Sequence, residues 1–243
     1  MGEMMRIAIV TGASSGIGEE FVKQIAQFSN IDEIWVIARR KTNLEILSST
    51  LKKNIRIISM DLCVQDNLDK LKKNMFQEMP DIKLLVNCAG YGIRKKFVEG
   101  TYEEELGMID INCKSLTAIT YICLPYMHKN SRIIQMASAA AFLPQAGFAI
   151  YSASKSYVLS FSRALNKELK NKCIYVTAVC PGPVDTEFFA ISDSGRTMPL
   201  YKQIFLAKVD QVVKKALRDS YNKKNISVYG FYIKILRVIT RFI

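Results

Sequence analysis

Short apolar stretches alternate with longer amphipathic ones along most of the chain. Six of the short stretches are rich in Ile and Val, as strands commonly are: Arg6–Thr11, Glu33–Ala38, Asn54–Ser59, Leu84–Asn87, Ser131–Met136 and Ile174–Val179. Most of them lack a strict alternation of apolar and polar residues. That pattern favours parallel strands that are covered on both faces of a sheet.

The segments between these strands have the apolar spacing of helices. Within Glu19–Phe28 apolar residues recur at helical intervals. Thr101–Tyr126 predicts one long helix or two in sequence, and Tyr151–Lys170 predicts another. The stretch from Pro181 to about Lys208 has no clear period and is interpreted as a long functional loop. Repeated strand–helix alternation without a linker predicts one α/β domain with a doubly wound parallel sheet.

Composition and charge indicate a globular protein with an anionic partner. Of the 243 residues, 49% are hydrophobic and 23% are charged, which excludes a disordered chain. The net charge of +12 makes nucleic acid, acidic lipid and a polyphosphate cofactor candidate partners without choosing among them. The Lys-Lys pairs are interpreted as helix surface, because they lack the interleaved aromatic residues of a single-strand nucleic-acid groove. No nucleic acid is therefore expected as a partner.

The cysteines and the single histidine, His128, do not form a metal-binding pattern. The six cysteines include no Cys-x-x-Cys pair, so no metal site is predicted. Buried free thiols in a reduced, cytoplasmic protein are expected instead. The N-terminal residues lack the apolar stretch and cleavage site of a signal peptide, and no run of about twenty apolar residues could span a bilayer.

A glycine-rich turn follows the first predicted strand and opens the first helix. Its sequence is Thr-Gly-Ala-Ser-Ser-Gly-Ile-Gly, from Thr11 to Gly18. Glycines let the backbone approach a ligand, and the free N–H groups of a helix N-terminus attract a pyrophosphate. The spacing differs from the plain Gly-x-Gly-x-x-Gly fingerprint. A tight turn that binds nothing is the alternative that the glycines alone leave open.

The residues after the second strand bear on the choice of nucleotide. An NAD site commonly has a carboxylate there for the ribose hydroxyl, but this strand ends in Ala38, Arg39, Arg40 and Lys41. Arg39 can hold a 2′-phosphate through its planar array of donors. The alternative is that these cations are solvated surface. NADP(H) is the predicted cofactor.

Four further residues suggest acid–base chemistry. Tyr151 and Lys155 are four positions apart, so on a helix they share a face. We expect the Lys155 ammonium to lower the pKa of the phenol toward neutrality, as a general acid/base requires. Ser138 ends a strand at the carboxyl edge of the sheet and can hydrogen-bond a substrate oxygen. Asn112 lies in the long helical segment.

These motifs together resemble the classical, single-domain short-chain dehydrogenases/reductases, and the resemblance covers nearly the whole chain. It implies a Rossmann-type fold with a cofactor half at about residues 1–130 and a catalytic and substrate-loop half at about 131–243. It also implies a catalytic tetrad of Asn112, Ser138, Tyr151 and Lys155. Tyr151 would transfer the proton, Lys155 would also bind the nicotinamide ribose, and Asn112 would hold a water that links the lysine to solvent.

The resemblance also implies a set of residues that bind the cofactor. Asp61 would contact the adenine, and the Pro-Gly turn after the sixth strand would meet the nicotinamide. The full set is Gly12, Ser14, Ser15, Gly16, Ile17, Gly18, Arg39, Arg40, Asp61, Leu62, Asn87, Ala89, Gly90, Tyr151, Lys155, Pro181, Gly182, Val184 and Thr186. Cys88 departs from the family, which usually has a second Asn there, and we expect little loss from it.

The predicted function is an NADP(H)-dependent oxidoreductase that interconverts a secondary alcohol and a ketone. The alternative is a non-catalytic dinucleotide-sensing or nucleic-acid-binding protein on the same fold. The expected substrate is small and apolar, with steroid-like or lipid-like molecules favoured, because the expected site lacks a basic cluster near Ser138. Its wall is expected to draw on the following residues: Ala139–Leu143, Phe148, Phe188, Phe189, Ile191, Met198, Tyr201 and Phe205. A homodimer or homotetramer is implied.

Residues 231–243 predict an amphipathic helix. Lys234, Arg237 and Arg241 fall on one narrow face, and a wide apolar arc including Phe231 and Val238 covers the other. At thirteen residues the helix would be about 20 Å long, too short for a hydrocarbon core of about 30 Å. We expect it to be ordered and to contribute to an oligomer interface or the substrate pocket. Peripheral contact with an acidic membrane is the alternative.

Overall fold

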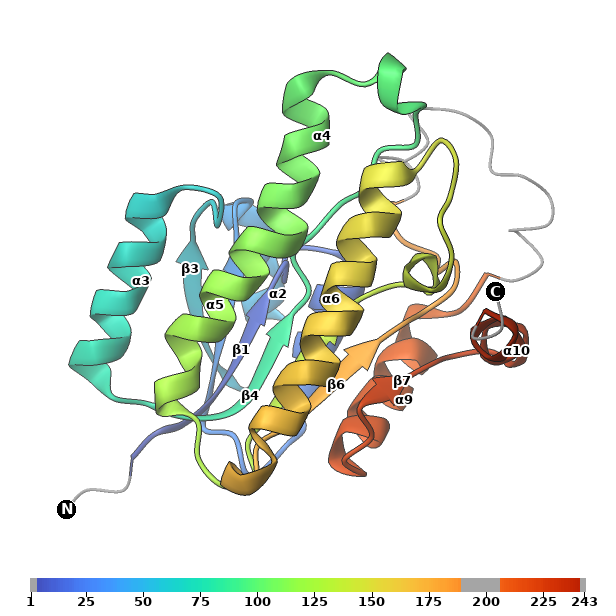
Figure 1. The fold of residues 1–243 in the computed structure, drawn as a ribbon. Coiled ribbons are helices and arrows are strands. Elements are labelled where there is room, and N and C mark those ends of the chain that lie inside the picture. The colour runs from blue at the N-terminus through green and yellow to red at the C-terminus, as the bar shows by residue number, and fades with distance from the viewer. Residues whose placement is uncertain (1–3, 189–205, 241–243) are drawn as a thin grey trace.

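A parallel sheet of seven strands forms the centre of the molecule (Figure 1). The computed structural model describes residues 4–188 and 206–240. The strand order is β3-β2-β1-β4-β5-β6-β7, and every neighbouring pair is parallel. The strands are β1 (Arg6–Thr11), β2 (Glu33–Ala38), β3 (Asn54–Ser59), β4 (Asp81–Asn87), β5 (Arg132–Met136), β6 (Tyr175–Val179) and β7 (Ile226–Ser227). The predicted doubly wound, Rossmann-type α/β fold is confirmed.

Helices cover both faces of the sheet, which explains why the strands are apolar throughout. In β1, Ala8 and Val10 face one core, and Ile7 and Ile9 face the other. The first core is completed by α1 (Gly16–Ile25), α2 (Lys41–Ser49) and α9 (Val209–Tyr221). The second core is completed by α3 (Gln65–Glu78), α5 (Leu116–Cys123) and α6 (Ala149–Glu168), which lie in front of the sheet in Figure 1.

The predicted helix over Thr101–Tyr126 is one helical segment with an irregular centre. It begins as α4 (Tyr102–Ile109), widens into a π-helical turn at Asp110–Ser115, and continues as α5. A short 3₁₀ turn ends it. Such π-helical turns inside α-helices are frequent at functional sites, and this one carries Asn112.

Several boundaries differ from the predicted ones. Strand β4 begins at Asp81 rather than Leu84, because Asp81 pairs with Arg6 of β1. Helix α1 ends at Ile25 rather than Phe28, and α6 begins at Ala149. The predicted loop from Pro181 to about Lys208 is described only at its two ends, where Val184 forms a bridge with Ala207.

The C-terminal helix α10 (Phe231–Ile239) follows the short strand β7. The prediction of an ordered helix from residue 231 is therefore confirmed as far as Ile239, and residues 241–243 lie outside the described ones. Across the described residues, no helix has the length and apolar character needed to cross a membrane.

Candidate active site

A cleft of about 510 Å³ opens at the carboxyl ends of the strands. Ligands of doubly wound sheets bind at this edge, where the crossover direction changes. The cleft brings together the turn after β1, the end of β2, the segments after β3, β4 and β5, helix α6, and the turn after β6. All of the predicted catalytic and cofactor-binding residues line it except two, Asn87 and Asn112. Of the stretch Ala139–Leu143 that was expected in the wall, only Ala139 and Ala140 line the cleft.

The glycine turn is shaped by close backbone packing. A Cβ atom on Gly18 would lie 2.2 Å from the Gly12 carbonyl oxygen, so only glycine fits there. Gly16 has a φ of +56°, which L side chains rarely adopt. Thr11 fastens the turn to the neighbouring strand by accepting hydrogen bonds from the backbone N–H groups of Cys88 and Ala89, both at 3.1 Å. The turn therefore presents bare backbone and the N-terminus of α1 to the cleft.

The two arginines after β2 have different surroundings. The Arg39 side chain is 76% exposed and lies 3.8 Å from the Asp61 carboxylate, so it is loosely held at the rim. Arg40 donates hydrogen bonds to the hydroxyls of Ser14 (3.2 Å) and Ser15 (2.5 Å) in the glycine turn. It also pairs at 3.1 Å with Glu187, which lies in the segment after β6.

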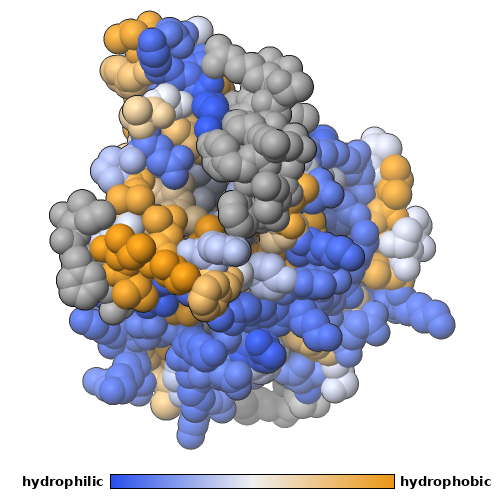
Figure 2. Space-filling model, turned by 90° about the vertical axis from the view of Figure 1, so that its right-hand side faces the viewer, coloured by the Kyte–Doolittle hydropathy of each residue, from blue (hydrophilic) through white to orange (hydrophobic). Residues whose placement is uncertain are grey.

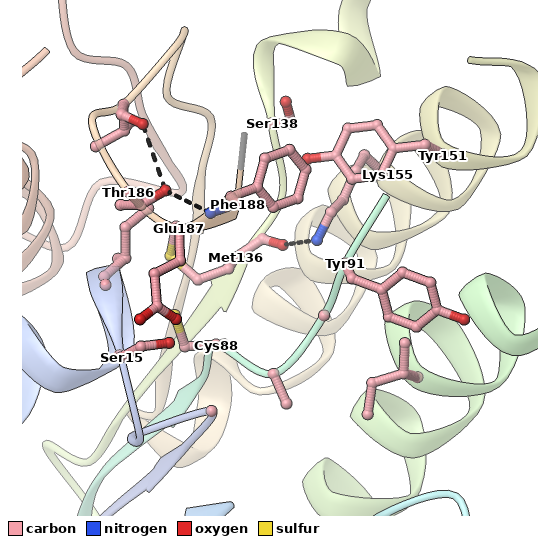
Figure 3. Close-up of a pocket in the computed structure, with 18 of the residues that line it drawn as sticks. Ser15, Cys88, Tyr91, Met136, Ser138, Tyr151, Lys155, Thr186, Glu187 and Phe188 are labelled. Carbon is pink, nitrogen blue, oxygen red and sulfur yellow. Dashed lines mark hydrogen bonds between the residues drawn. The ribbon is translucent and has the colours of Figure 1, made fainter. Parts of the chain in front are cut away.

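Glu187 was not singled out from the sequence. Its carboxylate lies near Ser15 in Figure 3 and reaches the cleft from the turn after β6. No local motif marks it, because its role depends on Arg40, a residue 147 positions away in the chain.

Ser138, Tyr151 and Lys155 converge at the inner end of the cleft (Figure 3). Tyr151 is 6% exposed and Lys155 is 5% exposed. The Tyr151 ring stacks on Phe148 with 4.2 Å between ring centroids, and it also contacts Phe188. Ser138 follows β5, and its side chain lowers the pKa of the Tyr151 phenol in part. These three predicted residues are thus brought together as expected.

The electrostatics of this pair differ from the prediction. The Lys155 Nζ donates to the Met136 carbonyl oxygen at 2.8 Å and lies 5.6 Å from the centre of the Tyr151 ring. Burial raises the pKa of Tyr151 to about 12, and the Ser138 hydrogen bond offsets this only in part. Burial also lowers the pKa of Lys155 to about 8. The expectation that Lys155 brings the phenol pKa toward neutrality is wrong here, because burial raises the pKa of Tyr151 more than the Ser138 side chain lowers it.

Asn112 lies behind the cleft wall. It is fully buried in the π-helical turn. Its Oδ1 accepts from the Tyr91 N–H at 3.1 Å, and its Nδ2 donates to the Tyr91 carbonyl at 2.9 Å and to the Ser154 hydroxyl at 3.0 Å. Its amide therefore holds the chain at Tyr91 in place. These contacts indicate that Asn112 positions the backbone beside the cleft. Its expected role in holding a water molecule stays a prediction.

Asn87 is also buried behind the wall. Its Nδ2 donates to the Thr120 hydroxyl at 3.0 Å, which ties the end of β4 to α5. The neighbouring Cys88, the departure from the family pattern, lines the cleft as a thiol whose pKa burial raises to about 12.

Arg94 is a further cleft residue that the sequence did not reveal. Its guanidinium lies 4.9 Å from the centre of the Phe148 ring, at the end of the cleft that holds Tyr151. The wall near Ser138 therefore lacks a basic cluster but does contain a cation. Phe189, Ile191, Met198, Tyr201 and Phe205, which were expected in this wall, lie outside the described residues.

Comparisons with known proteins agree with this geometry. Residues 6–196 match the family profile described as short chain dehydrogenase. An uncharacterised oxidoreductase of Staphylococcus epidermidis is 32% identical over 200 residues, which cover 82% of this chain and 86% of the relative.

Two solved structures have the same fold and similar length. A short-chain dehydrogenase from Sphingobium yanoikuyae in complex with NADPH matches with a TM-score of 0.81 and 25% identity, over 98% of this chain and 93% of that one. The bulky-bulky ketone specific alcohol dehydrogenase from Comamonas testosteroni matches with a TM-score of 0.79 and 25% identity, over 97% and 91% of the two chains.

Proposed function

The chain belongs to the short-chain dehydrogenase/reductase family, and from this premise we propose that it is an NADP(H)-dependent oxidoreductase that interconverts a ketone and a secondary alcohol. The observation that carries the proposal is the convergence of Ser138, Tyr151 and Lys155 in one cleft with the glycine turn. The similarity to a structure in complex with NADPH supports the choice of cofactor.

The residues of the cleft suit a phosphorylated dinucleotide. The glycine turn offers bare backbone at the N-terminus of α1, where a pyrophosphate is stabilised by N–H groups and the helix dipole. The exposed guanidinium of Arg39 stands at the rim with no carboxylate at Ala38 to repel a 2′-phosphate. Arg40 already binds Ser14, Ser15 and Glu187. We therefore propose that Arg39 binds the 2′-phosphate and that Arg40 holds the glycine turn in its conformation.

The bound nicotinamide would supply or accept the hydride. The Tyr151 phenol is protonated at neutral pH, as its ordinary pKa of 10.0 already requires, and burial raises that pKa further, to about 12. In the direction of ketone reduction it would donate this proton to the carbonyl oxygen. Ser138 stands beside it and can hydrogen-bond the same oxygen as negative charge develops there. Phe148 and Phe188 flank the phenol and exclude water from it.

The substrate is proposed to be an apolar ketone or secondary alcohol of moderate size, with steroid-like or lipid-like molecules favoured. Phe148, Phe188 and Ala140 form the described wall beside Tyr151, and this apolar surface favours an apolar ligand. The similarity to an alcohol dehydrogenase specific for bulky-bulky ketones supports the same substrate class.

The decisive experiment follows NADPH absorbance at 340 nm with a panel of short aliphatic, aromatic, steroid and acyl ketones, each with NADPH and with NADH. Turnover of apolar ketones with a preference for NADPH is expected. Activity on sugars or phosphorylated carbonyls alone would overturn the substrate class. Tight NADPH binding with no turnover across the panel would favour the dinucleotide-sensing alternative.

We also propose a cytoplasmic homodimer or homotetramer. All six thiols are free, as in a reducing compartment. Apolar side chains are exposed on the outer surface of α4 and α5, including Tyr102 and Tyr121, each 75% exposed. Burial of this surface against a second copy would remove it from water.

A further inference from the structure

The outer face of α10 is apolar. Phe231 is 71% exposed, Val238 is 54% exposed and Ile239 is 52% exposed, and Tyr232 and Ile235 are exposed as well. Figure 2 looks onto the side of the molecule where α10 lies and shows hydrophobic atoms gathered there. The helix therefore turns its predicted apolar arc away from the body of its own chain.

The inner face of α10 fixes this orientation. Ile233 packs on the core beneath β6 and β7 and fits so closely against Gly182 that a Cβ on that glycine would lie 2.9 Å from it. Gly230 caps the helix with a φ of +90°, which sets the angle at which the helix starts. The helix also packs against the turn Ala139–Phe142, which contributes Ala139 and Ala140 to the cleft wall. The apolar outer face is thus held in place at the rim of the cleft.

The charges around this face favour an anionic partner. No acidic residue follows Asp219 in the sequence, whereas Lys223, Lys224, Lys234, Arg237 and Arg241 do. Asp219 forms an ion pair with Lys224 at 2.9 Å. Lys234 is exposed and lies one helical turn from both Phe231 and Val238. A second copy of the same helix would bring Lys234 and Arg237 of the two chains together, and none of the described residues of this segment, 231–240, is acidic. An apolar helix face bordered by lysine and arginine instead suits anionic lipid headgroups.

We propose that α10 binds the surface of an anionic lipid bilayer, with Phe231, Ile235 and Val238 in the interface and Lys234 at the headgroups. The nine residues of α10 are too few to cross a bilayer, so the helix lies in the plane of the surface. Its inner face contacts Gly182, which lines the cleft. Binding therefore brings the mouth of the cleft close to the lipid. The proposal goes beyond the oxidoreductase activity and needs neither cofactor nor substrate.

The test is co-sedimentation of the full chain with lipid vesicles. Phosphatidylcholine vesicles are compared with vesicles in which about a third of the lipid is phosphatidylglycerol. We expect binding to the anionic vesicles, weakened when the salt concentration rises from about 0.1 M to 0.5 M, since the attraction between exposed charges is screened. Phe231→Ser with Val238→Ser should lower the partition coefficient at least tenfold. Lys234→Glu should remove most of the preference for anionic lipid.

The matched control is Phe97→Ser with Val98→Ser. These two side chains are 61% and 88% exposed on the short turn before α4, so the control removes a similar exposed apolar pair elsewhere. It should bind vesicles like the native chain. All changed residues are exposed, and thermal unfolding checks that each variant is folded.

Two outcomes of the sedimentation with vesicles would overturn the proposal, and a third measurement, made without lipid, can overturn it as well. One is native protein that stays in the supernatant with anionic vesicles at low salt. The other is equal loss of binding in the control and in the α10 variant. Sedimentation velocity without lipid completes the test: a smaller particle for the α10 variant would assign the face to a second copy instead.

Discussion

At the scale of single residues, the protonation of Tyr151 and Lys155 depends more on burial than on the interaction between the two side chains. Tyr151 and Lys155 occupy one face of α6 as their spacing requires. Burial removes water from both side chains, and it shifts each pKa in the direction that favours the uncharged form: up for Tyr151 and down for Lys155. The Met136 carbonyl, which the motif does not contain, receives the Lys155 hydrogen bond. The residue types in the motif could be predicted from the sequence. Their protonation could not, because it depends on what surrounds them in the fold.

Replacement of the phenol tests the proposed proton transfer. Tyr151→Phe keeps the ring that stacks on Phe148 and removes only the hydroxyl. We expect kcat to fall at least about a hundredfold, within the range of about 10² to 10⁴ for general acid–base catalysis, while NADPH affinity changes little. Steady-state kinetics and fluorescence titration measure the two effects. Turnover near the native rate would show that the proton comes from another group.

The buried lysine predicts a pH-dependent stability. Its pKa is about 8 in the folded chain against an ordinary value of 10.5, so between these values the unfolded chain binds more protons at this residue. Stability from this residue therefore rises with pH through that window. The free energy of unfolding of the native chain, relative to Lys155→Met, should increase by about 2 to 3 kcal/mol from about pH 7 to pH 10. A flat difference in denaturant titrations would show that the ammonium is well solvated.

Variants of Arg39 and Lys41 provide a matched test of the choice of cofactor. Both side chains are exposed at the end of β2, but only Arg39 is assigned to the 2′-phosphate. Arg39→Ala should weaken NADPH by about 1.5 to 3 kcal/mol, as loss of a charge-assisted contact does, and should leave NADH nearly unchanged. Lys41→Ala should affect neither. Equal kcat/KM with both cofactors in the native protein would contradict the assignment.

At the scale of elements, the strands that helices cover on both faces of the sheet could be predicted from their apolar sequence. Strands β1 and β2 match their predicted bounds because their apolar residues run without interruption after a polar first residue. Strand β3 matches as well, although Arg56 interrupts its apolar run. Strand β7 was missed because Ile226 and Ser227 are too few to form a pattern. Helix α9 was also missed, although Val212, Val213, Ala216 and Leu217 have helical spacing and are buried. That spacing is the signal that could have revealed it.

Asp219 joins these two unpredicted elements. It is 1% exposed and accepts from Lys215 of α9 at 2.6 Å, from Lys224 at 2.9 Å and from the Ser227 hydroxyl of β7 at 2.8 Å. These donors hold its pKa below the usual value. Asp219→Ala should cost about 3 to 5 kcal/mol, because it leaves the Lys215 ammonium, 16% exposed, and the buried Ser227 hydroxyl without their acceptor. Chemical denaturation measures the loss, and Asp210→Ala, at the exposed start of the same helix, is the control.

The lowered pKa of Asp219 also predicts how stability should change with pH. A carboxyl whose folded pKa is lowered adds stability at pH values above its ordinary pKa of 3.8. That stability is lost as the pH falls through the lower folded pKa. The gap in stability between the native chain and Asp219→Ala should therefore narrow below about pH 4. An unchanged gap at acid pH would mean that packing, and not charge, accounts for the loss.

At the scale of the whole molecule, the two exposed apolar surfaces have separate assignments. The surface of α4 and α5 is assigned to a second copy, and the outer face of α10 to lipid. The sequence predicted that α10 is amphipathic, but it could not show which face turns outward. That orientation depends on the fit of Ile233 against Gly182, two residues far apart in the chain.

The subunit contact gives the last prediction. Tyr102 of α4 and Tyr121 of α5 are each 75% exposed, and in a symmetric dimer the same patch meets itself. Tyr102→Glu with Tyr121→Glu would place like charges across that contact and leave two apolar rings fewer to bury. We therefore expect the mass measured by light scattering to fall to that of a single chain or a smaller assembly. Ile46→Glu on α2, 61% exposed on the opposite side of the sheet, should leave the mass unchanged. A native protein that is already a single chain in solution would refute the assignment, because the surface would then have no second copy to cover it.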